Sequence, residues 1–153
     1  MNSANNSTRG GRFDNGKEVN SFEYISFKKD DDGNLPSNLF CDFAQQAAKD
    51  IAGNGNKFTG NKPTQLRRFF DEIIMWNEKL NQCDDKEKKF NEYLPFIRML
   101  NAKAAYAKGR KLINDDFVTL LSHCINQVKT ADDFYILKLF FEAFMGFYKL
   151  EKN

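Results

Sequence analysis

The amino-acid sequence predicts an all-α protein, a compact bundle of about five helices that follows a flexible amino-terminal tail. Apolar residues recur at intervals of three or four along five stretches after Pro36. Residues typical of helix ends lie beside several of these stretches, and no stretch alternates strand with helix patterns. With 153 residues, 41% of them hydrophobic and 16 of them Phe, the chain has enough apolar surface for one core, and it is too short for two domains.

The first 34 residues are rich in Asn, Ser, Gly and charged side chains. Such a composition does not bury enough apolar surface to offset the entropy of ordering, so we expect residues 1–34 to form a flexible tail and residues 35–153 the helical domain. "RGGRF", Arg9 to Phe13, resembles one copy of the RGG segments of RNA-binding tails. "FEYISF", Phe22 to Phe27, alternates like a short strand, which is compatible with an extended piece added to a neighbouring protein.

Two helices are expected in the first half of the helical domain. The first runs from a cap at Ser37 or Asn38 to about Ala52, where Gly53 provides a stop. The second covers residues 64–81. Its apolar side chains form a single stripe and therefore predict a core-facing side. They are Leu66, Phe69, Phe70, Ile73, Trp76 and Leu80.

Three further helices are expected in the second half. One covers residues 85–108, and Pro95 should bend or break it because the proline ring clashes with the preceding turn. The next begins at the cap residue Asn114, and the last begins at Thr130 with two aspartates in its first turn. Residues 134–148 of the last helix are apolar nearly all round, so this helix is either the centre of the bundle or meets another chain.

Positive charge is concentrated in the middle of the chain. The net charge is only +2, but residues 53–111 contain 13 Lys and Arg against 7 Asp and Glu, a balance of +6. The flanking segments, residues 1–52 and 112–153, each have a balance of −2. Such clustering suits a polyanionic partner, although a solvated basic face is the commoner cause.

The sequence predicts a cytoplasmic protein without a membrane span. No apolar run approaches the roughly 20 residues that a membrane helix needs, and the amino terminus has no hydrophobic signal segment. The three cysteines, Cys41, Cys83 and Cys124, are widely spaced and contain no CxxC pair, which fits reduced thiols in a cytosolic protein.

Nothing in the sequence predicts an enzyme, a cofactor or a metal site. His123 and Cys124 are adjacent, so on a helix they point about 100° apart and do not form a catalytic pair or chelate one metal through that spacing. Asp115, Asp116 and the aspartates that follow Thr130 lie in the first turns of helices, where negative charge is favourable without any catalytic role.

Arg67 and Arg68 are placed unusually, in the first turn expected for the second helix. The helix dipole disfavours cations there by a few tenths to about 1 kcal/mol each. Phosphate contacts would offset this cost. The alternative is a pair of ion pairs one helical turn apart, Arg67 with Asp71 and Arg68 with Glu72.

A second group of cations ends the third helix in "NAKAAYAKGRK", Asn101 to Lys111. Lys103, Tyr106 and Arg110 recur at intervals of three and four, so they lie along one line of the helix, and small alanines beside that line let a bulky partner approach. The alternative for Arg110 and Lys111 is a simple helix end, because the dipole favours cations there.

Two motifs and a third segment resemble the small α-helical subunit of type III-A CRISPR (Csm) effector complexes. They are "PTQLRRFFDEI" (63–73), "AKAAYAKGR" (102–110) and the aromatic "DFYILKLFFEAFMGFYKL" (133–150), in that order. The resemblance implies a non-catalytic helical protein that binds the backbone of guide and target RNA without sequence specificity. It also implies contacts with the backbone and large subunits and with further copies of itself.

The resemblance and the charge pattern together give seven candidate RNA-binding residues. The alternative function is a helical protein-interaction module with no direct nucleic-acid contact, in which the aromatic last helix docks on a partner. The candidates are Gln65, Arg67, Arg68, Lys103, Tyr106, Arg110 and Lys111.

Overall fold

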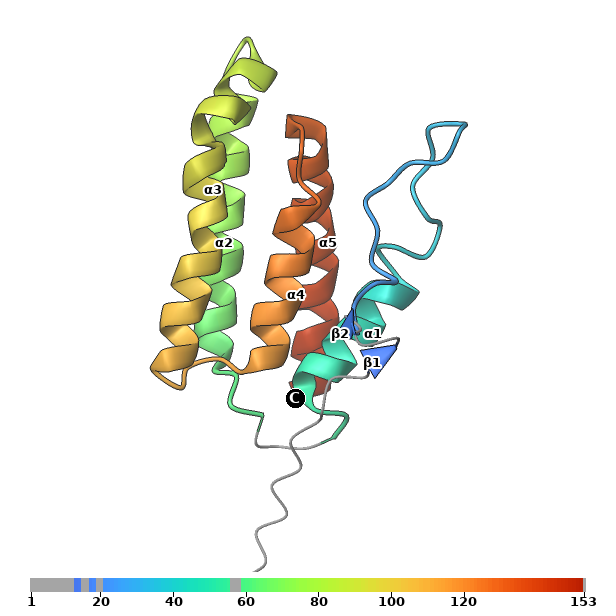
Figure 1. The fold of residues 1–153 in the computed structure, drawn as a ribbon, viewed down its shortest axis with the longest axis vertical. Coiled ribbons are helices and arrows are strands. Elements are labelled where there is room, and N and C mark those ends of the chain that lie inside the picture. The colour runs from blue at the N-terminus through green and yellow to red at the C-terminus, as the bar shows by residue number, and fades with distance from the viewer. Residues whose placement is uncertain (1–12, 15–16, 19–20, 56–58, 153) are drawn as a thin grey trace, which may run out of the picture.

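The computed structural model describes residues 13–14, 17–18, 21–55 and 59–152 of the chain (Figure 1). In this part the protein has five helices preceded by two paired antiparallel strands of two residues each, which confirms the prediction of a helical bundle. The elements are β1 (Phe13–Asp14), β2 (Lys17–Glu18), α1 (Asp42–Ala52), α2 (Pro63–Asn81), α3 (Lys86–Gly109), α4 (Asp115–Asn126) and α5 (Ala131–Lys152).

Helices α2 to α5 alternate in direction along the chain, as in an up-and-down bundle (Figure 1). The hairpin of α2 and α3 forms one side of the bundle. In this arrangement α2 packs against α5 and α3 packs against α4. The shorter α1 packs mainly against α5, on the side away from the α2–α3 hairpin.

Helix α5 is the centre of the core. Its phenylalanines Phe134, Phe140 and Phe144 are completely buried, and the Phe141 ring contacts those of Phe140 and Phe144 edge-on. The central position explains why the sequence of this helix is apolar nearly all round. Of the two alternatives drawn from its sequence, the structure supports the first, a helix at the centre of the bundle that contacts all four other helices.

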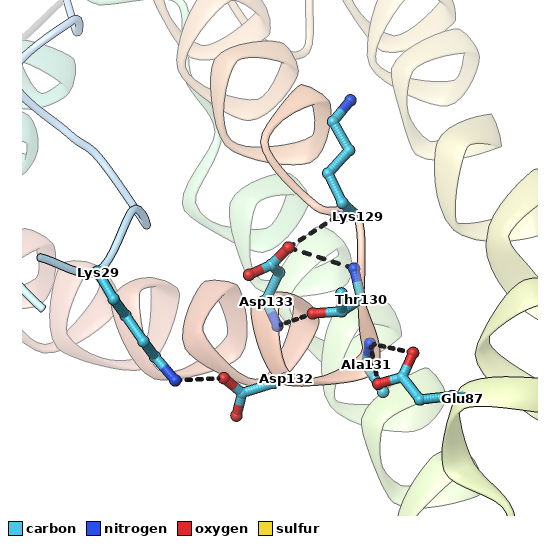
Figure 2. A network of polar contacts seen from close by, with 7 residues as sticks. All are labelled: Lys29, Glu87, Lys129, Thr130, Ala131, Asp132 and Asp133. Carbon is cyan, nitrogen blue, oxygen red and sulfur yellow. Dashed lines mark hydrogen bonds and ion pairs between the residues drawn. The ribbon is translucent and has the colours of Figure 1, made fainter. Parts of the chain in front are cut away.

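The amino terminus of α5 is held by a network of polar contacts from three parts of the chain (Figure 2). The Thr130 hydroxyl accepts a hydrogen bond from the Asp133 amide at 3.1 Å, and the Asp133 carboxylate accepts one from the Thr130 amide at 3.2 Å. The Glu87 carboxylate from α3 accepts a bond from the Ala131 amide at 3.1 Å, and Lys29 pairs with Asp132 at 2.7 Å. The expected start of this helix at Thr130 is confirmed, and its capping extends beyond local sequence.

The start of α4 is also as predicted. The Asn114 side chain accepts a hydrogen bond from the Phe117 amide at 3.0 Å, which satisfies one of the free amides of the first turn.

Two helix predictions differ from the structure: the predicted start of the first helix is wrong, and Pro95 does not break the third helix. Helix α1 begins at Asp42, because the residues from Pro36 to Cys41 form successive turns in which the Asn38 carbonyl accepts from the Cys41 and Phe43 amides. Pro95 does not interrupt α3, which continues through it. Because Pro95 is exposed, its ring displaces no packed neighbour, and the cost is confined to the backbone.

The predicted tail boundary was also wrong. Phe22, Ile25 and Phe27 are each at most 3% exposed and belong to the same core as the helices. The Gln127 side-chain amide from the end of α4 secures this segment, since it donates to the Ile25 carbonyl at 2.9 Å and accepts from the Phe27 amide at 3.0 Å. The alternation in "FEYISF" thus buries apolar side chains on the chain's own bundle, whereas "RGGRF" lies outside the described residues except for the backbone of Phe13.

Candidate nucleic-acid interface

A buried asparagine brings the start of α2 beside the end of α3. The Asn61 side chain donates to the Ile51 carbonyl at 3.3 Å and accepts from the Asn114 amide at 2.8 Å. Next to it, the Lys62 amide donates to the Leu112 carbonyl at 2.9 Å. These bonds fix the loop before α2 against the loop after α3, so the two segments predicted to carry RNA contacts become neighbours.

Five of the seven candidate residues line one groove between α2 and α3, with a volume of about 490 Å³. The motifs at residues 63–73 and 102–110 are far apart in the sequence. The antiparallel hairpin of α2 and α3 brings them together. The candidates in the groove are Gln65, Arg68, Lys103, Tyr106 and Arg110, and the other lining residues are Phe69, Glu72, Ala107 and Leu112.

The groove has three cations and one carboxylate among its lining residues. Lys103 Nζ lies 2.5 Å from Glu72 Oε1, which leaves the positive charges of Arg68 and Arg110 in excess. The Arg110 guanidinium lies 5.8 Å from the centre of the Tyr106 ring, and Tyr106 is 68% exposed. The groove therefore offers an open, net positive surface with an aromatic ring beside a cation.

Arg67 lies outside this groove. Its Nε is 3.0 Å from Asp71 Oδ1, and its guanidinium lies 5.6 Å from the centre of the Phe70 ring. The alternative of an ion pair one turn along the helix therefore holds for Arg67. Because α2 begins at Pro63, Arg67 also falls just after the first turn, where the dipole penalty is smaller.

The proposed pairing of Arg68 with Glu72 is replaced by the contact between Glu72 and Lys103 across the two helices. Arg68 is exposed and faces the groove.

Lys111 is not among the residues that line the groove. It is exposed and adopts a left-handed backbone with φ of 62°, and its amide donates to the Lys108 carbonyl at 2.8 Å. Lys108 forms an ion pair with Asp115 of α4. Lys108, in the last turn of α3, and Lys111, just after this helix, thus both take part in contacts at the link between α3 and α4.

The residues that a nuclease or metal hypothesis would use have structural contacts. His123 Nε2 lies 2.7 Å from the Ile25 carbonyl oxygen, at the junction of α4 with the amino-terminal segment. Within the described residues, no group of three or more His, Cys, Asp or Glu side chains is placed to hold a metal ion. None of the helices in the described part has the length and apolar character needed to cross a membrane.

An aromatic cluster that was not predicted from the sequence lies next to the groove. Trp76 of α2, which we had placed on the core stripe, is only half-buried, and its ring lies 5.2 Å from Tyr93 and 5.9 Å from Phe96 of α3. Phe96 and Met99 continue the three-and-four spacing of Lys103 and Tyr106 toward the start of α3. This spacing is the sequence pattern from which the exposed position of Phe96 and Met99 on the same side of α3 could have been predicted.

Comparison with known proteins agrees with the motifs. A family model described as Csm2 Type III-A matches residues 38–153, a range that contains α1 to α5 and every candidate residue. No curated protein and no solved structure matches the chain. The chain belongs to the Csm2 Type III-A family, the small subunit of the type III-A Csm complex, as the resemblance of its motifs predicts.

Proposed function

We propose that this small subunit binds the sugar-phosphate backbone of guide and target RNA in the groove between α2 and α3, without sequence specificity. The observation that supports the proposal is the convergence of Arg68, Lys103 and Arg110 with Gln65 and Tyr106 on one open surface. Arginine and lysine neutralise phosphates, and an amide or phenol adds hydrogen bonds that position a strand without reading its bases.

The groove has a suitable length for a strand. Lys103 and Arg110 are seven residues apart on α3, which corresponds to roughly 10 Å along the helix axis. A nucleic-acid strand presents several phosphates over such a distance. Arg68 faces the same groove from α2, so one strand passing between the helices would contact cations on both sides.

We propose further that the subunit is non-catalytic and acts in the cytoplasm, where it associates with the backbone and large subunits and with further copies of itself. Base pairing between guide and target would then supply all sequence specificity. Incubation of labelled RNA with the purified protein, with and without Mg²⁺ or Mn²⁺, should give no cleavage. Cleavage that is lost in a His123→Ala or Asp115→Ala variant would contradict this part of the proposal.

The groove proposal is tested by the salt dependence of RNA binding. Fluorescence anisotropy with a labelled single-stranded RNA would be measured at several salt concentrations for the native protein and for Arg68→Ala and Arg110→Ala. Each substitution should weaken binding to all base sequences alike and reduce the slope of log K against log salt by about 0.7. Arg98→Ala is the matched control, because Arg98 is an exposed cation of α3 that lies outside the groove lining.

Equal slopes for all four proteins would contradict the groove proposal. If Arg68→Ala and Arg110→Ala instead left RNA binding unchanged but reduced recovery of the other Csm subunits, the groove would be a protein-docking surface. That result would favour the alternative of an interaction module without nucleic-acid contact.

A further inference from the structure

We infer that an aromatic seam next to the groove stacks on unpaired bases of the same RNA strand. The aromatic seam consists of Trp76 on α2 and Phe96, Met99 and Tyr106 on α3. The inference rests on the proposed binding of the RNA backbone in the groove and adds a second kind of contact to it, with the bases.

The geometry of the aromatic seam suits stacking. The rings of Trp76 and Phe96 lie nearly parallel, at 18°, with 5.9 Å between their centres. Phe96 is 50% exposed and Met99 48%, although both lie on a helix whose other side forms the core. A folded chain that leaves such side chains on its surface presents an apolar platform to a partner.

The aromatic seam continues the groove without a break. Phe96, Met99, Lys103, Tyr106 and Arg110 are separated by three, four, three and four residues, so they form one ridge along α3. On α2, Trp76 lies one turn after Glu72, and Glu72 contacts Lys103 across the two helices. A strand held at Arg110 and Lys103 would reach Phe96 after roughly another 10 Å along the same ridge.

The distribution of charge favours RNA over a protein as the partner. The cores of protein interfaces are depleted of charged residues. Here Lys103 lies between the two exposed aromatic residues of the ridge, and Lys79 Nζ lies 5.1 Å from the centre of the Trp76 ring. Cations interspersed with aromatic rings are typical of surfaces that bind single-stranded nucleic acids, where rings stack on bases and cations hold phosphates.

The test compares two strands that differ only in their bases. One is a short oligouridylate, and the other is an abasic ribose-phosphate strand of equal length and charge. Affinity would be measured for the native full chain, Phe96→Ala, Arg110→Ala and Tyr135→Ala. Tyr135 is a matched control because it is an exposed aromatic residue on α5, outside the aromatic seam. Trp76 is the only tryptophan of the chain, so its fluorescence reports directly on the seam.

The native protein should bind oligouridylate roughly five- to a hundred-fold more tightly than the abasic strand, the range expected for stacking of one base. Only the strand with bases should quench Trp76 fluorescence. Phe96→Ala should remove the difference between the strands and leave the salt slope unchanged, whereas Arg110→Ala should weaken both strands alike. Tyr135→Ala should behave as the native protein.

Equal affinity for the two strands, with Arg110→Ala still weakening both, would overturn base stacking and leave the groove proposal standing. Loss of other Csm subunits from Phe96→Ala with unchanged RNA binding would also overturn it and assign the seam to a protein partner. If Arg110→Ala changed neither strand's affinity, both the groove and the seam would be wrong. Circular dichroism verifies the fold of each variant. Because the substituted side chains are exposed, the fold should be unchanged.

Discussion

Individual buried polar groups influence the stability of this small core. The Tyr148 hydroxyl is buried and has no hydrogen-bond partner within the described chain, while its ring stacks on Phe144 at 5.8 Å. Tyr148→Phe keeps the ring and removes the unsatisfied hydroxyl. The free energy of unfolding, measured by urea denaturation, should rise by about 1 kcal/mol. A decrease of that size would show that the hydroxyl has a partner in solution.

Burial also makes stability depend on pH at the alkaline end. It raises the pKa of the Cys124 thiol and of the Tyr148 hydroxyl, and burial with the nearby Asp50 carboxylate raises that of Tyr24. Each group is neutral when protonated, so the folded state holds its proton more tightly than the unfolded state. The resulting stability is present below the unfolded pKa values, about 8.5 for Cys and 10 for Tyr, and is lost as pH rises above them.

The urea midpoint should therefore fall between pH 8 and pH 10.5, and it should fall less steeply in Tyr148→Phe and in Cys124→Ala. Cys41 is exposed and provides the control substitution, Cys41→Ala, which should leave the pH dependence as it is in the native protein. A midpoint that stays constant over this range would contradict the account.

The contacts and exposure of individual side chains were the features least well predicted from the sequence. The spacing of one helical turn suggested Glu72 as the partner of Arg68, but in the structure Glu72 contacts Lys103 instead. Lys103 is 31 residues away from Glu72 in the chain and reaches it only through the hairpin of α2 and α3. The exposure of Phe96 was not predicted, because it depends on which side of α3 packs against α4, and local sequence does not determine this.

Side-chain caps within one turn mark the starts of α3, α4 and α5, and the start of α5 is also tied to distant parts of the chain. At the start of α5, Asp133 and Thr130 bond each other's amides as a local pair, while Glu87 and Lys29 contribute from far along the chain (Figure 2). Asp133→Ala removes the acceptor of two amides, those of Lys129 and Thr130.

This substitution should lower the free energy of unfolding by about 1 kcal/mol, the usual cost of a lost cap. Asp132→Ala is the comparison, because Asp132 contributes an exposed ion pair of little energetic value. Equal effects of the two substitutions, measured by urea denaturation, would contradict the capping role of Asp133.

The starts of α4 and α5 could be predicted because Asn114 and Thr130 act through bonds within one turn. The start of α1 could not be predicted in this way. Successive turns before this helix bury Leu39 in the core, so its apolar spacing resembles that of a helix although the residue lies outside one. Pro95 illustrates the same limit, because α3 continues through it while packed against α2 and α4, and this packing is not contained in the local sequence.

On the scale of the whole molecule, the amino-terminal segment from residue 21 is part of the domain. Phe22 is 1% exposed in the core. Phe22→Ala should therefore lower the free energy of unfolding by about 3–5 kcal/mol, which in a domain of this size removes much of its stability. The thermal midpoint measured by circular dichroism tests this, with the exposed Glu23→Ala as the control. Native stability of Phe22→Ala would restore the tail boundary at residue 34.

The bundle as a whole was predictable from apolar spacing, because each helix buries an apolar side and α5, at the centre, buries seven of its 22 residues. The place of the amino-terminal segment was not, since its composition resembles that of a flexible tail although Phe22, Ile25 and Phe27 are buried in the core. The convergence of two distant motifs on one groove is likewise a property of the hairpin between α2 and α3.

The central claim, that RNA lies in the α2–α3 groove, is tested most directly by ultraviolet cross-linking of the assembled Csm complex with its guide and target RNA. Mass spectrometry would then identify the peptides of this subunit that carry a cross-linked nucleotide. We predict cross-links at Tyr106 and in the Gln65–Arg68 segment. Cross-links confined to α1 or α5, with none in α2 or α3, would contradict the account.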